Sequence, residues 1–227
     1  MPNFLTSANL FIGCLAIIEI FEGKLENVIY YVIASGVMDF FDGFAARLTK
    51  STSNIGKDLD SLADMVSFSL VPALLMYQMV LNIDSTSQLA HIPLIIAVLS
   101  ALRLAKFNND TRQTDHFHGL PVPANALLIS AIPYIHGQGY FVSILDNLFV
   151  LVGISIVMAL LLVADYPLIA LKFKNYKWQD NKPQYILIIS SIISLATFQL
   201  VALPFVILFY IVISIFDNVL TPNKKLL

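Results

Sequence analysis

The sequence predicts an all-α fold, a polytopic transmembrane bundle of about eight helices. Of its 227 residues, 58% are apolar and 12% are charged, and the mean hydropathy is +0.79. Soluble domains are nearer to about 45–50% apolar and about 25% charged. Long runs without charge recur along the chain, and about 20 apolar residues are enough to cross a bilayer.

Eight apolar segments account for the predicted number of helices. They cover about 4–21, 27–41, 62–81, 92–104, 122–135, 148–164, 185–198 and 203–216. The chain is expected to fold back near Gln199 and Pro204, because proline removes a backbone donor and disrupts a helix. The sequence His136-Gly-Gln-Gly139 predicts a similar turn between the fifth and sixth segments. No internal repeat is apparent, so 1–227 is predicted to be one integral membrane domain.

Basic residues support this topology. With the amino terminus in the cytoplasm, all but one of the 13 Lys and Arg residues fall on the cytoplasmic side; Lys24 is the exception. The positive-inside rule predicts such a bias. The first apolar run has no basic region before it and no clear cleavage site, so it is expected to remain as the first span. The net charge of −2 argues against a nucleic-acid partner, and the single Cys14 excludes an internal disulfide.

Four aspartates interrupt the apolar pattern. Asp39 and Asp42 are three residues apart, and Asp60 and Asp64 are four apart, so each pair lies on one face of its own helix. A polar loop between the two helices can bring all four carboxylates into one pocket at the cytoplasmic boundary. Carboxylates are costly beside a membrane. Hard oxygen ligands at this density suit Mg²⁺ or Mn²⁺, and four are enough to hold two such cations. A salt-bridge network with Arg47, Lys50 and Lys57 is the structural alternative.

The pattern D-x2-D-G-x2-A-R-x8-G-x3-D-x3-D is met at every position from Asp39 to Asp64. It resembles the signature of the CDP-alcohol phosphotransferase family. Members of that family transfer a substituted phosphate from a CDP-linked lipid or alcohol to a second alcohol and release CMP. The resemblance implies a six-helix catalytic core, here about 1–165, to which the helix pair at about 185–217 is an addition. It also implies a homodimer.

The resemblance further implies roles for individual residues. Asp39 and Asp60 would bridge two divalent cations, Asp42 would complete the first cation site, and Asp64 would complete the second and act as general base. The residues that would contact the cytidine phosphate are Gly43, Arg47, Ser53, Thr6 and Asn9. A glycine permits close approach of a ligand to the backbone, and arginine can pair with phosphate.

Three shorter stretches, 2–10, 103–108 and 119–124, resemble the phosphatidylserine synthase branch of the family. They predict CDP-diacylglycerol and L-serine as substrates, with Arg103 and Asn108 contacting the serine. His116 and His118 are interpreted as loop residues rather than metal ligands.

Three alternatives stay open, the third of which is a purely structural membrane subunit. The first is the same chemistry on glycerol 3-phosphate or an inositol phosphate, although such acceptors need more cationic side chains than Arg103 and Lys106 provide. The second is a cation transporter, although transporters usually bind ions near the midplane between repeated halves. The expected location is the inner membrane of a prokaryotic cell, among membrane lipids, with the site facing the cytoplasm.

Overall fold

The structure is a computed structural model, and it describes residues 2–49, 54–109, 116–169, 178 and 181–220. Helices dominate these residues, as predicted. In chain order they are α1 (Pro2–Phe21), α2 (Val28–Thr49), α3 (Asn54–Asp64), α4 (Val71–Ile83), α5 (Ile95–Asn109), α6 (Val122–Gly137), α7 (Val142–Leu145), α8 (Leu148–Val163), α9 (Lys182–Phe198) and α10 (Leu203–Leu220). A π-helical segment, Met65–Leu70, joins α3 to α4, and 3₁₀ turns cover Leu25–Asn27, Gln88–Leu94 and Gln199–Ala202.

Several of these helices are long and apolar enough to cross a membrane. Among the described residues they are Asn3–Phe21, Leu25–Ala46, Ile55–Ile83, Gln88–Asn109 and Lys182–Phe216, and Leu148–Val163 is a shorter apolar helix. The segment Lys182–Phe216 folds back between α9 and α10, where Gln199 has a φ of 52°. The predicted break near Gln199 is therefore confirmed. The protein is an integral membrane protein.

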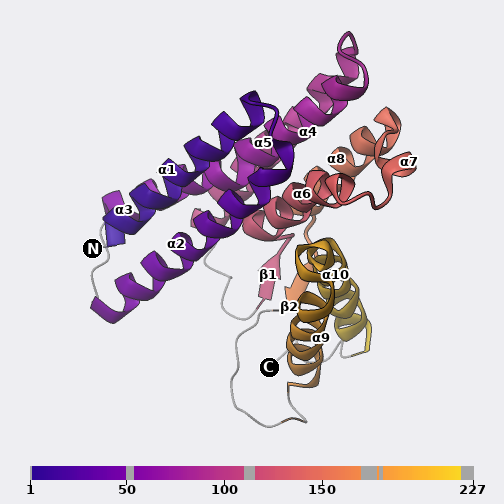
Figure 1. The fold of residues 1–227 in the computed structure, drawn as a ribbon. Coiled ribbons are helices and arrows are strands. Elements are labelled where there is room, and N and C mark those ends of the chain that lie inside the picture. The colour runs from indigo at the N-terminus through magenta and orange to yellow at the C-terminus, as the bar shows by residue number, and fades with distance from the viewer. Residues whose placement is uncertain (1, 50–53, 110–115, 170–177, 179–180, 221–227) are drawn as a thin grey trace.

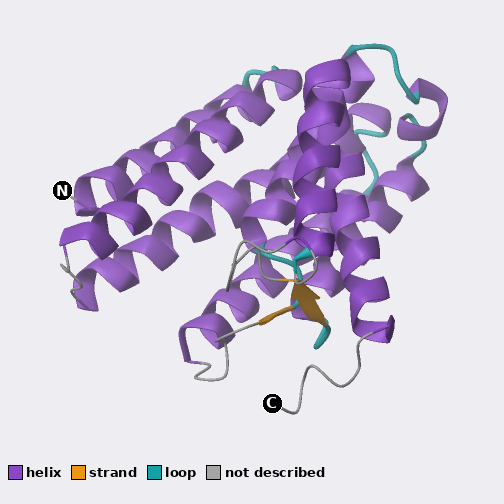
Figure 2. Ribbon diagram, turned by 90° about the horizontal axis from the view of Figure 1, so that it is seen from below, coloured by secondary structure: helices purple, strands orange, loops and turns teal. Residues whose placement is uncertain are grey.

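The helices pack around one apolar core. Helix α1 lies between α2 and α3, α5 packs on α8, and α6 runs through the middle and contacts α2, α4 and α10. Figure 1 shows α9 and α10 as a pair beside the other helices, and Figure 2 shows the same molecule from below. The core contains Phe68, Ile29, Met76 and Ile129, all essentially inaccessible to solvent.

One element of the fold departs from the all-helical prediction. His116–His118 (β1) and Pro167–Ile169 (β2) form a short antiparallel pair, so the two histidines lie in a strand rather than in a loop. Helix α10 holds this pair in place, because Tyr210 Oη donates to the Ile169 carbonyl at 3.0 Å and Ser214 Oγ accepts from the Ile169 N–H at 3.2 Å. Two strands of three residues are too short to leave a hydrophobic alternation in the sequence.

Helices α2 and α3 are longer than their apolar runs. The sequence suggested that the second segment ends near residue 41 and the third begins near residue 62, but α2 continues to Thr49 and α3 starts at Asn54. Hydropathy detects only the part of a helix that is uniformly apolar, whereas these polar turns extend beyond it. The aspartates consequently lie inside regular helices, which fixes their spacing.

The π-helical segment follows directly after Asp64 and precedes Pro72. Proline lacks an N–H and its ring clashes with the carbonyl four residues earlier. The wider π turn, in which the Val71 N–H donates to the Val66 carbonyl, accommodates this proline without breaking the helix. Such turns are rare and occur frequently at functional sites.

Gly13 allows α1 to approach the π segment closely. A Cβ at this position would overlap Ser67 Oγ and would lie 3.0 Å from Ser67 Cα. Ser67 Oγ in turn donates to the Asn9 carbonyl at 3.0 Å. The absence of a side chain at Gly13 therefore sets the distance between α1 and the helix that carries Asp60 and Asp64. Small residues commonly have this role between membrane helices.

We expect Gly13→Ala to lower the free energy of unfolding by about 1–3 kcal/mol, because an added methyl group in a packed interface forces the backbones apart. The midpoint of thermal unfolding in detergent measures the change. Gly36→Ala is the matched control, since nothing lies within 4 Å of a Cβ built at Gly36. Equal destabilisation of both variants would contradict this account of Gly13.

Candidate active site

The structure brings the two acidic pairs together where the second half of α2 lies beside the carboxyl-terminal half of α3. One carboxylate oxygen from each of Asp39, Asp42 and Asp60 lies within 4.8 Å of the other two. Asp64, one turn further along α3, is within electrostatic range of Asp39 and Asp60. Four carboxylates from two helices thus share one site, as their spacing suggested.

Helix α1 supports the site from a third side. Thr6 Oγ1 donates to Asp42 Oδ2 at 2.7 Å, and Asn9 Nδ2 is 3.4 Å from Asp64 Oδ1. Both side chains are buried, with 3% of Thr6 and none of Asn9 exposed. The sequence suggested Thr6 and Asn9 as ligand contacts, and the structure gives each of them a carboxylate partner.

Arg103 approaches the site from α5. Its side chain is within electrostatic range of Asp64 and of Tyr210 on α10, and its guanidinium carbon is 5.6 Å from the centre of the Phe107 ring. Arg103 Nε is buried and has no hydrogen-bond partner. An unpartnered buried donor beside a carboxylate marks a place where a ligand can bind.

The other predicted site residues have different surroundings. Gly43 and Arg47 follow Asp39 and Asp42 within α2, and Ser53 lies outside the described residues. The amide of Asn108 faces α3, where its Nδ2 donates to Ser61 Oγ at 2.7 Å, and its carbonyl accepts from Lys57 Nζ at 2.9 Å. Asn108 therefore ties α5 to α3, and its contact with a substrate stays a prediction.

The carboxylates of this cluster lie close enough to repel one another when they are ionised. Two carboxylates less than 5 Å apart repel each other by about 3 kcal/mol at an effective dielectric constant of about 20. Asp60 Oδ1 is buried and has no hydrogen-bond partner. Carboxylate oxygens without hydrogen-bond partners are hard ligands of the kind that divalent cations take up. The residues present therefore fit a divalent metal site.

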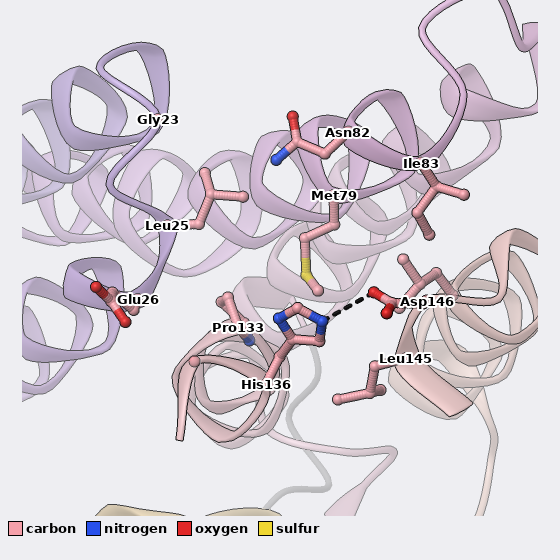
Figure 3. A pocket seen from close by; sticks show the side chains of 12 residues that line it. Gly23, Leu25, Glu26, Met79, Asn82, Ile83, Pro133, His136, Leu145 and Asp146 are labelled. Atoms are coloured by element: carbon pink, nitrogen blue, oxygen red, sulfur yellow. Dashed lines mark hydrogen bonds and ion pairs between the residues drawn. The ribbon is translucent and has the colours of Figure 1, made fainter. Parts of the chain in front are cut away.

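A polar cavity lies at the opposite end of the bundle. Its volume is about 360 Å³, and its lining includes Glu26, Asn82, His136 and Asp146. Figure 3 shows the ion pair in its wall, in which His136 Nε2 is 2.8 Å from Asp146 Oδ1. None of the four aspartates lines this cavity, so it is separate from the candidate active site.

Comparison with known proteins identifies the family. The model of the CDP-alcohol phosphatidyltransferase family matches residues 1–164. The chain is 32% identical over 193 residues to a CDP-diacylglycerol–serine O-phosphatidyltransferase of Helicobacter pylori, a match that covers 83% of this chain and 78% of the relative. It is also 32% identical over 160 residues to an archaetidylserine synthase of Methanothermobacter thermautotrophicus, which covers 70% of this chain and 66% of that protein.

A third relative, the CDP-diacylglycerol–serine O-phosphatidyltransferase of Bacillus subtilis, is 32% identical over 127 residues, or 54% of this chain and 69% of the relative. The family match contains the whole aspartate array, both helices that carry it, and the α1 residues that support it. The chain is therefore a CDP-dependent phosphatidyltransferase and belongs to the CDP-alcohol phosphatidyltransferase family.

Proposed function

We propose that the protein transfers the phosphatidyl group of CDP-diacylglycerol to the hydroxyl of L-serine and releases phosphatidylserine and CMP. The observation that carries this proposal is the convergence of Asp39, Asp42 and Asp60 beside Asp64 in a chain with relatives named CDP-diacylglycerol–serine O-phosphatidyltransferase. The same evidence favours an active site at the membrane boundary, where a lipid substrate and a water-soluble alcohol can both arrive.

Asp39, Asp42, Asp60 and Asp64 would hold two divalent cations, Mg²⁺ or Mn²⁺. The unpartnered Asp60 Oδ1 and the short separations between the carboxylates support this assignment. Such cations, when bound, neutralise charge on the attacking and leaving oxygens of an in-line displacement at phosphorus. The cations also relieve the repulsion among the four aspartates.

Asp64 is the proposed general base. It would take the proton from the serine hydroxyl as the serine oxygen forms its bond to the diacylglycerol-bearing phosphorus and as the bond from phosphorus to CMP breaks. CMP leaves with the electron pair of that bond. Asn9 would hold the Asp64 carboxylate in one orientation, since its amide lies 3.4 Å from Asp64 Oδ1. Positioning of this kind accounts for much of the efficiency of a general base.

The cytoplasmic orientation of the site is also part of the proposal, and it is supported by the distribution of Lys and Arg. The membrane would be the inner membrane of a prokaryotic cell. We further propose that residues 1–165 are the catalytic core of a single domain, that α9 and α10 are an addition to it, and that the enzyme is a homodimer.

Thr6→Val is expected to weaken divalent cation binding about 10- to 100-fold. The substitution keeps the shape of the side chain but removes the hydroxyl that donates to Asp42, and loss of such an outer contact has effects of this size. The Mg²⁺ concentration at half-maximal activity measures the change. The control is Ser7→Ala, because the exposed Ser7 hydroxyl donates only to the Asn3 carbonyl among the contacts described. Unchanged metal dependence in Thr6→Val would contradict the role of Thr6.

An assay with purified protein tests the function. Radiolabelled CDP-diacylglycerol is incubated with Mg²⁺ or Mn²⁺ and, in separate reactions, with L-serine, glycerol 3-phosphate or an inositol phosphate. We expect CMP release and phospholipid formation only in the reaction that contains L-serine, where the product is phosphatidylserine. Turnover with another alcohol but not with L-serine would reject the serine assignment and keep the reaction class.

A further inference from the structure

Three side chains on α5 and α6 contain buried polar atoms that have no hydrogen-bond partner among the described residues. Asn125 is fully buried, and neither Nδ2 nor Oδ1 has a partner. Ser100 is also fully buried and its Oγ is unpartnered, as is the Nε of Arg103. Nearly all buried polar groups in proteins are hydrogen-bonded, and unsatisfied ones are especially costly within a membrane. Such exceptions therefore indicate places that a polar ligand can fill.

Ser100 and Arg103 lie on the same face of α5, because residues three apart on a helix are neighbours. Arg103 is within electrostatic range of Asp64 on one side and of Tyr210 on the other. Helix α5 also packs on the π segment that follows Asp64. This face of α5 is therefore directed to the candidate active site.

The first half of α6, which contains Asn125, lies in the same region. Just before α6 begins, the Leu120 N–H donates to the Leu161 carbonyl near the end of α8. At the other end of α6, Gly137 lies against the Glu26 side chain. The second half of α6 lines one cavity with Asn82 and Ile83 at the end of α4, so the contact of α6 with the π segment, which precedes α4, is expected in its first half. Helix α6 also contacts α5 and α10, the helices that carry Arg103 and Tyr210.

We propose that Asn125, together with Arg103 and Ser100, forms the subsite for the zwitterionic end of the acceptor amino acid. This inference rests on the proposed function and adds a residue that determines specificity. The Arg103 guanidinium matches a carboxylate, with which it can form two parallel hydrogen bonds. Asn125 Oδ1 and Ser100 Oγ accept hydrogen bonds from the ammonium group. The hydroxymethyl group of the amino acid is then directed to Asp64.

This arrangement also explains why these buried atoms of Asn125, Ser100 and Arg103 lack partners within the protein. A hydroxyl acceptor with both a carboxylate and an ammonium group supplies all the missing partners at once. An acceptor that lacks one of these groups leaves a buried polar atom unpaired, and binding sites built on buried hydrogen bonds reject such analogues strongly.

Asn125→Leu in the full-length enzyme tests the proposal. The variant is expected to raise the KM for L-serine on the order of 10- to 100-fold, as loss of a hydrogen bond to a charged group does, while the KM for CDP-diacylglycerol stays unchanged. The inhibition constant of 3-hydroxypropanoate, which has no ammonium group, is expected to be the same for the variant and the wild-type enzyme. In the absence of serine the variant is expected to melt at the same temperature as the wild type or higher, because leucine leaves no polar atom unpaired.

Ser130→Ala is the matched control. Ser130 is equally buried on α6, but its hydroxyl donates to the Leu127 carbonyl at 3.3 Å, so the KM for L-serine is expected to stay unchanged. An Asn125→Leu enzyme with a lower melting temperature and a normal KM for L-serine would show that Asn125 is structural and overturn the inference. If Asn125→Leu does not fold, the smaller change Asn125→Ser must raise the KM for L-serine, and a normal value overturns the inference. Wild-type enzyme without turnover of L-serine would overturn the proposed function itself.

Discussion

Asp64→Asn is expected to lower kcat by about 10²- to 10⁴-fold, the usual contribution of a general base. The amide keeps the shape of the side chain and can still accept a hydrogen bond from Asn9, but it cannot take a proton from the attacking hydroxyl. Rates of CMP release at saturating CDP-diacylglycerol and L-serine measure the effect. The melting temperature is expected to change little or to rise, because one of four mutually repelling carboxylates is removed.

Asp58→Asn is the matched control for this experiment. Asp58 lies on the same helix, α3, but it is exposed and does not belong to the cluster. The Asp58→Asn enzyme should retain at least half of the wild-type kcat. Full activity of the Asp64→Asn enzyme would show that Asp64 is not the general base and has only a structural role in the site.

Asp60→Asn is expected to weaken divalent cation binding on the order of 100-fold or more, since loss of even an outer-shell contact costs about 10- to 100-fold. Asp60 is central to the site, because its carboxylate is close to Asp39 and Asp42 and within range of Asp64. Titration of the purified protein with Mn²⁺, followed calorimetrically, measures the affinity without a need for turnover. Chelation of metal from the wild-type enzyme should abolish activity, and added Mg²⁺ or Mn²⁺ should restore it.

Glu26→Gln provides the comparison for Asp60→Asn. Glu26 is an acidic residue in the lining of the cavity at the other end of the bundle. Its substitution should leave the Mn²⁺ affinity of the catalytic site unchanged. An Asp60→Asn protein that binds Mn²⁺ as tightly as the wild type would refute the assignment of Asp60 as a metal ligand.

The transmembrane helices and the aspartate cluster could be predicted because each leaves a strong local signal. Charge-free segments of sufficient length indicate membrane helices, and intervals of three and four residues put Asp39 with Asp42 and Asp60 with Asp64 on single helix faces. The break at Gln199 could be predicted because Pro204 follows closely. These features depend on residues that are near one another in the sequence.

Features that depend on distant residues could not be predicted in this way. Hydropathy stops at the last apolar residue, so it missed the polar turns of α2 up to Thr49 and of α3 from Asn54. The π segment compensates for Pro72 in a way that no periodicity reveals. Asn125 was overlooked because its importance comes from its missing partners, although an asparagine within an apolar membrane helix is itself a signal.

Under the proposed function, the position of the aspartate cluster at one end of the bundle would also determine where the lipid product first appears. Each newly made phospholipid keeps its head group at the end of the bundle where the carboxylates lie, because a charged head group crosses hydrocarbon only at great cost. Under the proposed function, synthesis would therefore enrich a single leaflet.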